Sequence, residues 1–186
     1  MTEYKSWPLG QLPPEFQRPE LDQLKKNGYK FSDPREVVDI FEKKVAKFAG
    51  AKYGIAVDCC SHGLFLSLKW YKDVMKMITE HIHIPRYTYC SVPMQIIHAG
   101  FKPVFEDVTW SGMYQLRPFD IWDGAVRWTQ GMYKSGFHIV SFQLKKRIPI
   151  GRGGMILTND KKAADWFRKM TYDGRDLNIG LSLIHI

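Results

Sequence analysis

The sequence predicts an α/β fold, in which a mostly parallel sheet carries helices on both faces. Stretches with strand character alternate with stretches of helical period in the middle of the chain, and this βαβαβ order favours parallel strands joined by crossover helices. Hydrophobic residues make up 45% of the 186 residues, which is enough for a packed core. We find no internal repeat and no low-complexity segment.

An N-terminal arm is expected to precede the first structured element. Residues 1–31 contain four of the ten prolines and show no clear period, which predicts an extended arm. A helix follows, because Asp33 suits its N-cap and Pro34 its first position. One apolar stripe runs along this helix until Gly50 ends it: Val37, Phe41, Val45 and Phe48.

The remaining elements alternate in type along the chain. Period and flanking residues predict strands at 53–57, 81–84, 103–105, 137–142 and 154–158, and helices at 61–77, 92–99 and 161–170. Asp160 is placed to cap the last helix, which should bury Ala164, Phe167 and Trp166. The segment Val108 to Asp120, with its Trp, Gly and Pro residues, is expected to be a loop.

The charge of the chain narrows the class of ligand. Lys and Arg outnumber Asp and Glu by 27 to 19, and such a charge suits either a nucleic acid or an anionic small molecule. The positive residues are spread along the chain, and no nucleic-acid-binding signature is present. This distribution argues against a nucleic-acid partner and favours a phosphate-bearing cofactor and substrate.

The sequence also lacks targeting, membrane-spanning and metal-binding signals. No apolar run approaches the roughly 20 residues that span a bilayer, and the N-terminus lacks the apolar core of a signal peptide. We therefore expect no membrane contact and a cytoplasmic location. The three cysteines form neither a disulfide framework nor a zinc spacing. His81 and His83 lack a third ligand at a suitable spacing, so we expect no metal.

Polar and aromatic side chains stand where the predicted strands end, which is where open α/β sheets bind ligands. Cys60 and Ser61 begin a helix, whose N-terminus offers N–H groups and a positive dipole end to a phosphate. The plainer alternative is that Ser61 only caps this helix. Tyr89 follows the second strand and Asp123 follows Ile121, although a core aromatic and a turn-capping aspartate remain alternatives.

The most informative stretch lies between Ser141 and Asp160. It reads SFQLKK and then, after four residues, GRGGMILTND. A serine–phenylalanine pair, three residues, a lysine and a glycine-rich turn into a strand resemble the DegT/DnrJ/EryC1/StrS family of sugar aminotransferases, which depend on pyridoxal 5'-phosphate (PLP). Four further segments match this family in the same order: residues 41–57, Cys60-Ser61, 85–100 and 103–107.

The resemblance implies a fold, a reaction and a set of roles. The fold would be the large domain of PLP-transferase fold type I, and an amino group would pass from glutamate or glutamine to a nucleotide-linked keto-sugar. Lys146 would bind the cofactor covalently and shuttle a proton, and Asp123 would pair with the ring nitrogen. The remaining cofactor contacts would come from Tyr89, stacked on the ring, and from Cys60, Ser61 and Ser141 at the phosphate.

Three substitutions depart from the family pattern. Cys60 replaces the usual glycine at the phosphate turn, so the backbone is less free to approach the phosphate there. Val126 stands where the family has a polar residue that bonds the ring oxygen of the cofactor. Arg152 replaces a residue that is commonly acidic in the glycine-rich turn.

The length of the chain also departs from the family. Only fifteen residues separate Asp107 from Asp123, where the family places a further strand and helix, so we expect a compact variant that lacks one βα unit. The large domain is expected at 32–180 and is incomplete without the small C-terminal domain of the family. Residues 181–186 resemble a translated library adapter and are expected to be a non-native tail. The full-length form is expected to be a homodimer.

Two other classes of function stay open on the sequence alone. One is a non-catalytic protein that keeps the PLP fold as a binding or regulatory module, which Val126 and Arg152 favour and Lys146 and Asp123 oppose. The other is a basic nucleic-acid-binding domain, for which net charge is the sole support. A cofactor absorbance band that depends on Lys146 would separate the two PLP-binding hypotheses from the last one.

Overall fold

The computed structural model describes residues 20–30 and 34–172 of the chain, which divides into two units, residues 1–41 and 42–186. In the first unit, residues Glu20–Lys26 form helix α1. The prediction of an extended arm at 1–31 is therefore wrong for this part, because these seven residues contain no proline and are mostly good helix formers. The predicted tail at 181–186 lies outside the described residues.

The larger sheet has five strands in the order β1–β7–β6–β5–β4. Their bounds are β1 Tyr53–Val57, β4 Tyr114–Gln115, β5 Ile121–Asp123, β6 Phe137–Ser141 and β7 Gly154–Thr158. Only β5 and β6 pair in parallel here, whereas β1–β7, β6–β7 and β4–β5 are antiparallel. The expected mostly parallel sheet is thus a mixed sheet, since a short turn-rich connection without a crossover helix returns β7 alongside β6.

A second sheet consists of the parallel strands β2 (His81–Pro85) and β3 (Lys102–Glu106). Helix α4 (Ser91–His98) makes the crossover between them, as the sequence predicts. Its Val92 and Ile96 are buried, and Ile82 and Ile84 of β2 are 0% and 1% exposed. This βαβ unit therefore contributes buried residues to the hydrophobic core.

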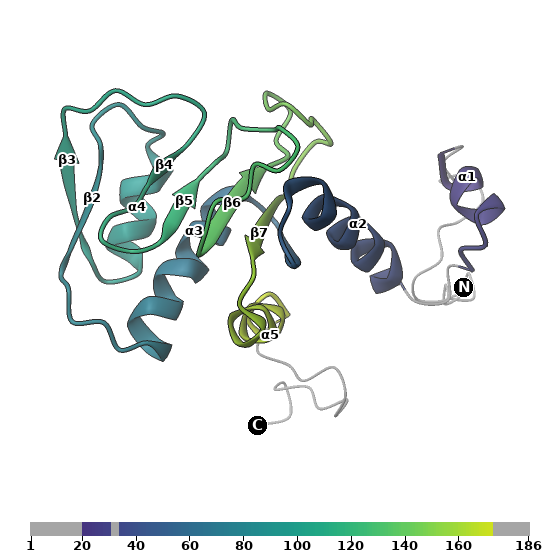
Figure 1. Cartoon of the computed structure of the whole chain (residues 1–186), viewed down its shortest axis with the longest axis horizontal. Coiled ribbons are helices and arrows are strands. Elements are labelled where there is room, and N and C mark those ends of the chain that lie inside the picture. Colours follow the sequence, from purple (N-terminus) through teal and green to yellow (C-terminus); the bar gives the residue numbers. More distant parts are fainter. Residues whose placement is uncertain (1–19, 31–33, 173–186) are drawn as a thin grey trace, which may run out of the picture. The chain divides into compact units, whose positions relative to one another are not determined.

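The connection between β3 and β5 joins the two sheets. It contains no helix, and all of its residues are described. Instead of the predicted loop it forms β4, which pairs with β5, and then runs along β2, where the N–H groups of His83 and Arg117 donate to each other's carbonyl oxygens at 2.8 and 3.1 Å. Figure 1 shows β4 beside β5. The predicted absence of one βα unit is confirmed, and this connection fills its place.

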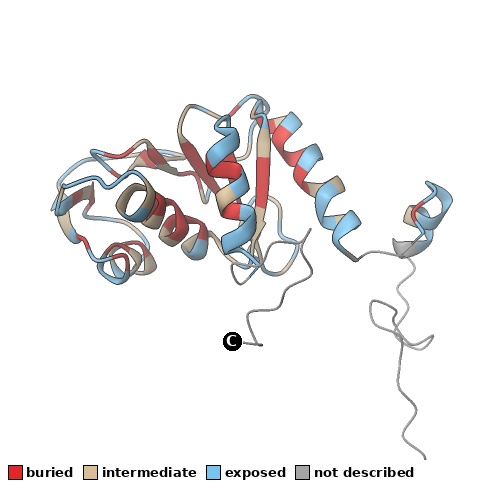
Figure 2. Cartoon of the chain, turned by 90° about the horizontal axis from the view of Figure 1, so that it is seen from below, coloured by how far each residue is buried: buried red, intermediate tan, exposed pale blue. Residues whose placement is uncertain are grey.

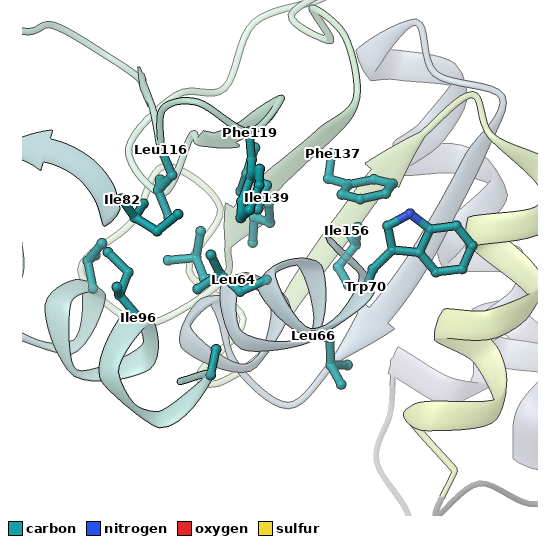
Figure 3. Close-up of a cluster of buried hydrophobic side chains, with 14 of the residues drawn as sticks. Leu64, Leu66, Trp70, Ile82, Ile96, Leu116, Phe119, Phe137, Ile139 and Ile156 are labelled. Carbon is teal, nitrogen blue, oxygen red and sulfur yellow. The ribbon is translucent and has the colours of Figure 1, made fainter. Parts of the chain in front are cut away.

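One face of the larger sheet is covered by helices α3 (Cys60–Lys69) and α5 (Lys161–Met170). A Cβ atom at Gly63 would lie 2.8 Å from Ile139, so α3 rests directly on the strands. Phe167 of α5 meets Trp70 and Phe137 in ring contacts. Figure 3 shows Leu64 of α3 beneath Ile139, within the main hydrophobic core.

Helix α3 is shorter than the sequence predicts. We expected a helix at 61–77, but α3 ends at Lys69 and the chain continues as a π-helical segment, η2 (Trp70–Val74). Trp70 is 3% exposed and contacts Trp166 and Phe167 as well as Phe137. These aromatic contacts stabilise the wider π-helical turn. Because they join residues that are far apart in the sequence, the hydrophobic periodicity of residues 61–77 does not predict them.

The opposite face of the larger sheet receives the end of helix α2 (Pro34–Ala49). A Cβ atom at Gly54 would lie 2.9 Å from the Glu42 carbonyl oxygen. Because side chains alternate along a strand, this Cβ position lies on the face of β1 opposite to that of the next residue, Ile55, which packs in the main hydrophobic core. Phe48 stacks on Trp128 at 4.9 Å. Helices therefore lie on both faces, as predicted, and Figure 2 shows buried residues along the strands and on one side of the helices.

Candidate active site

Asp123 is a buried acid at the carboxyl end of β5, with 6% of its surface exposed. The hydroxyl of Tyr114 donates a hydrogen bond to Asp123 Oδ2 at 2.7 Å, and the Ala125 N–H donates to Oδ1 at 3.0 Å. Burial raises the pKa of the Asp123 carboxyl, while Tyr114, the Ala125 N–H and the Lys146 ammonium each oppose that shift. A carboxylate in such a place is stabilised by a cationic partner.

Lys146 follows β6, the strand that lies next to β5 (Figure 1). Its N–H donates to the Gln143 carbonyl oxygen at 2.8 Å, and the residue is partly buried, whereas Lys145 is exposed. Burial raises the pKa of both the Asp123 carboxyl and the Cys60 thiol, and the Lys146 ammonium partly offsets each rise. Such effects fall off with distance, so Lys146 lies within electrostatic range of Asp123 and Cys60, in the environment that follows the carboxyl ends of β5 and β6.

The N-terminus of α3 borders this environment. Its N-cap, Cys59, makes no side-chain capping bond, so the first N–H groups of the helix have no side-chain acceptor there. Burial raises the pKa of the Cys60 thiol, and the Asp123 carboxylate adds to that shift. Gly154 permits the close approach of the helix to β7, since a Cβ atom there would lie 2.7 Å from the Cys60 nitrogen.

Ser61 does not cap its helix, which was the plainer alternative. Its hydroxyl instead shares a hydrogen bond of 2.7 Å with the hydroxyl of Ser91, the first residue of α4. Ser141 ends β6 and pairs with Gly154, the residue that touches the start of α3, and its hydroxyl accepts from the Gln143 N–H at 3.4 Å. Ser61 and Ser141 thus both lie near the N-terminus of α3.

Tyr89 lies on the surface, just before the start of α4. It is 72% exposed, and its carbonyl oxygen accepts from the Val92 N–H at 2.9 Å. The neighbouring Thr88 is the residue that reaches inward, through a short hydrogen bond between its hydroxyl and that of Tyr114. The ring-stacking role of Tyr89 therefore stays a prediction.

Arg152, one of the residues that depart from the family pattern, forms an ion pair with Asp58. Arg152 donates to Asp58 at 3.1 Å, and His62 forms an ion pair with the same carboxylate. Together with Cys59, Asp58 and His62 offer three ligand atoms within 4.8 Å of one another. The sequence does not predict this group, because Asp58, Cys59 and His62 match neither a paired-cysteine zinc spacing nor the alternating pattern of His81 and His83. The Arg152 guanidinium and the positive end of α3 weigh against a cation there, so we describe it as an ion-pair cluster.

Three residues around the candidate site had no signal in the sequence: Tyr114, Thr88 and Ser91. Each is a common residue type in a segment that was assigned to a loop or to a helix start. Their partners lie nine, twenty-six and thirty positions away in the chain. Only the folded arrangement brings these side chains to the site.

Comparison with known sequences is consistent with this geometry. The sequence model of the DegT/DnrJ/EryC1/StrS aminotransferase family matches residues 15–121 and 130–180. The spore coat polysaccharide biosynthesis protein SpsC of Bacillus subtilis (strain 168) is 26% identical over 202 residues, covering 83% of this chain and 50% of SpsC. The chain thus spans about half the length of this relative.

Solved structures show the same fold. PseC of Helicobacter pylori, an aminotransferase involved in the biosynthesis of pseudoaminic acid, superposes with a TM-score of 0.63 at 14% identity, covering 78% of this chain and 51% of PseC. DesI, solved in the presence of its TDP-sugar product, gives 0.62 at 20% identity, covering 86% and 50%. The predicted fold, that of PLP-dependent aminotransferases of fold type I, is therefore confirmed.

None of the helices in the described part of the chain combines the length and apolar character needed to cross a bilayer.

Proposed function

Because the chain belongs to the DegT/DnrJ/EryC1/StrS aminotransferase family, we propose that it carries the cofactor-binding residues of a PLP-dependent aminotransferase that acts on a nucleotide-linked keto-sugar. The observation that supports this most directly is the buried carboxylate of Asp123 at the end of β5, whose charge is stabilised by Lys146 in the turn after the neighbouring parallel strand β6. A lysine amine for the aldehyde and an acidic partner for the ring nitrogen are one pair of groups by which PLP enzymes hold the cofactor.

The residues of the site fit the chemistry of the cofactor. PLP is a phosphate ester, an aldehyde and a pyridine in one molecule, and it supplies an electron sink when bound. The uncapped start of α3, with Ser61 and Ser141 nearby, suits the phosphate. Lys146 suits the aldehyde, and the buried Asp123 suits a protonated ring nitrogen, because a cationic neighbour offsets the cost of burying its charge.

Each residue then has a defined role in the proposed reaction. Asp123 holds a proton at the ring nitrogen, Lys146 binds the cofactor and moves a proton at the substrate carbon, and the start of α3 orients the phosphate. Burial of Asp123 excludes water from the side of the site formed by β5. Tyr89 is proposed to cover the ring from the exposed side.

The substrate class rests on the family and on its solved members. DesI was crystallised with a TDP-sugar product, and a net charge of +8 suits substrates that carry phosphate groups. We propose glutamate or glutamine as the amino donor, a nucleotide-linked keto-sugar as the acceptor, a homodimer as the full-length assembly and the cytoplasm as its location.

A non-catalytic role for the same fold is the second candidate. Val126, which is 39% exposed, provides no polar atom for the ring oxygen of the cofactor, and Arg152 is engaged with Asp58. A protein of this kind would bind PLP through Lys146 without transferring amino groups.

One experiment separates these functions. The purified chain with PLP should show a cofactor absorbance band that borohydride removes and that Lys146→Ala lacks, while the exposed Lys145→Ala keeps it as the matched control. Adding glutamate should then convert the band to the amine form of the cofactor. A band that ignores glutamate would support the non-catalytic role, and a band equally strong in Lys146→Ala would refute the assignment of the lysine.

A further inference from the structure

Tyr114 lies in the connection that joins β3 to β5, and it is the residue of β4 that pairs directly with Asp123. Its side chain is buried, with 6% exposed. The Tyr114 hydroxyl donates to Asp123 Oδ2 at 2.7 Å, and the Thr88 hydroxyl forms a short hydrogen bond with the same oxygen of Tyr114. Since an ionised carboxylate only accepts, the chain of bonds runs from Thr88 through Tyr114 to Asp123.

The ring of Tyr114 is held in place by its neighbours. It meets Trp110 at a centroid distance of 4.8 Å in an edge-to-face contact, and the Trp110 indole N–H donates to the Tyr87 carbonyl oxygen at 2.9 Å. The β4–β5 pairing fixes its backbone. These contacts direct the hydroxyl toward Asp123.

The electrostatics agree with this geometry. Of the groups that oppose the effect of burial on the pKa of Asp123, the Tyr114 hydroxyl is the strongest, ahead of the Ala125 N–H and Lys146. Burial, and then the Asp123 charge, raise the pKa of Tyr114 itself, so its hydroxyl keeps its proton and remains a donor. A hydrogen bond to a buried charge is worth more than one between neutral groups.

We propose that Tyr114 is a positioning residue, whose hydroxyl orients the Asp123 carboxylate and keeps it ionised toward the ring nitrogen of the cofactor. The role of Tyr114 toward the cofactor rests on the proposed function, whereas the Tyr114–Asp123 hydrogen bond is present in the chain without a cofactor. The short connection that stands in place of a strand and helix thereby contributes a side chain to the site.

The test uses Tyr114→Phe, which keeps the ring and removes the hydroxyl. Tyr133→Phe is the matched control, since the Tyr133 hydroxyl donates to the Gly136 carbonyl oxygen at 3.2 Å. In the cofactor-free protein, NMR titration of the Asp123 carboxyl carbon should show a pKa about one to two units higher in Tyr114→Phe than in the parent chain. Thr88→Val, which removes the outer donor, should shift it in the same direction by less.

In the PLP-loaded protein, Tyr114→Phe should move the pH dependence of the cofactor absorbance and lower the rate of the glutamate half-reaction roughly 10- to 100-fold with KM little changed. An Asp123 pKa equal to that of the parent in both Tyr114→Phe and Thr88→Val would overturn the positioning role. Failure of the parent chain to bind PLP would instead overturn the proposed function, and the titration would still decide the role of Tyr114.

Discussion

At the scale of single residues, the site depends on the groups that offset the cost of burying the Asp123 carboxylate. Asp123 has lost most of its water, and a hydroxyl, a backbone N–H and the Lys146 ammonium replace it. Burial still raises the pKa of this carboxyl despite these three groups, and a protonated pyridine nearby would stabilise its charged form further. The same residue therefore ties the electrostatics of the chain to its proposed cofactor.

Replacing this carboxylate should separate cofactor binding from the reaction. In Asp123→Asn the side chain keeps its size and can still meet the ring nitrogen, but no charge holds the proton there. We expect PLP binding to remain measurable and the glutamate half-reaction to slow by roughly 100-fold or more. Stopped-flow absorbance of both forms decides this, and an unchanged rate would mean that another acid serves the ring nitrogen.

A second buried ionisable residue, His138, makes the fold sensitive to acid. It is the second residue of β6 and is 0% exposed, and neither ring nitrogen has a hydrogen-bond partner within the described residues. Burial, with a smaller effect from Arg127, lowers its pKa to about 4. The unfolded chain takes up this proton near pH 6.5, so the folded state loses stability as the pH falls from about 6.5 to about 4.

The expected slope from this group is about 1.4 kcal/mol of unfolding free energy per pH unit within that window. Urea unfolding at pH 7, 6 and 5 should show a smaller loss for His138→Leu than for the parent chain. His98→Leu, at an exposed position, is the control and should follow the parent. Parallel curves for His138→Leu and the parent would show that His138 is not the acid-sensitive group.

At the scale of elements, the connection between β3 and β5 holds the core together as well as the site. It pairs with β5 through β4 and with β2 through Arg117. The connection therefore links the two sheets by backbone hydrogen bonds to each of them. Between these contacts lies Leu116, which is 0% exposed and which Figure 3 shows beside Ile82. An exposed loop would not need this residue.

Truncating Leu116 should therefore destabilise the protein as a core substitution does. We expect Leu116→Ala to lower the free energy of unfolding by about 2–5 kcal/mol, because it removes buried methyl groups and leaves a cavity. Leu144→Ala, at a position that is 68% exposed, should change it by less than about 0.5 kcal/mol. Equal effects in urea unfolding would mean that the connection is not part of the core.

At the scale of the whole molecule, the chain spans about half the length of the relatives it matches. Its fold nevertheless brings together residues from β5, the turn after β6 and the start of α3, which are the elements that the proposed cofactor would join. A ligand held by several elements at once stabilises the folded state, because the unfolded chain cannot offer the same contacts.

PLP should accordingly raise the melting temperature. At a free concentration of 100 times Kd the gain is about 2.7 kcal/mol, which for a domain of this size corresponds to roughly 5–10 °C. Differential scanning calorimetry would measure it, with inorganic phosphate as the anion control and Lys146→Ala expected to show a reduced shift. An equal shift with phosphate alone would indicate anion binding without a cofactor site.

The sequence by itself determined the local elements, and its family resemblance predicts the cofactor lysine. The bounds of β1 and β7, the helix from Lys161 to Met170 and the cap in which Asp160 accepts from the Ala163 N–H follow from short-range period and capping chemistry. The motif of the family, counted from Ser141, predicts Lys146 rather than Lys145 as the cofactor lysine, and Lys146 is the less exposed of the two. Such features depend on neighbours within a few residues, so they can be read locally.

Only the tertiary structure decided which strands pair, in which direction, and which side chains meet. The antiparallel β7, the bond from Tyr114 to Asp123 and the bond between Ser61 and Ser91 all depend on the order of the strands and on the faces they turn to each other. No local period encodes these relations, because they join segments that the chain separates. Burial then gives the contacts their strength, since it removes the water that would otherwise compete for each polar group.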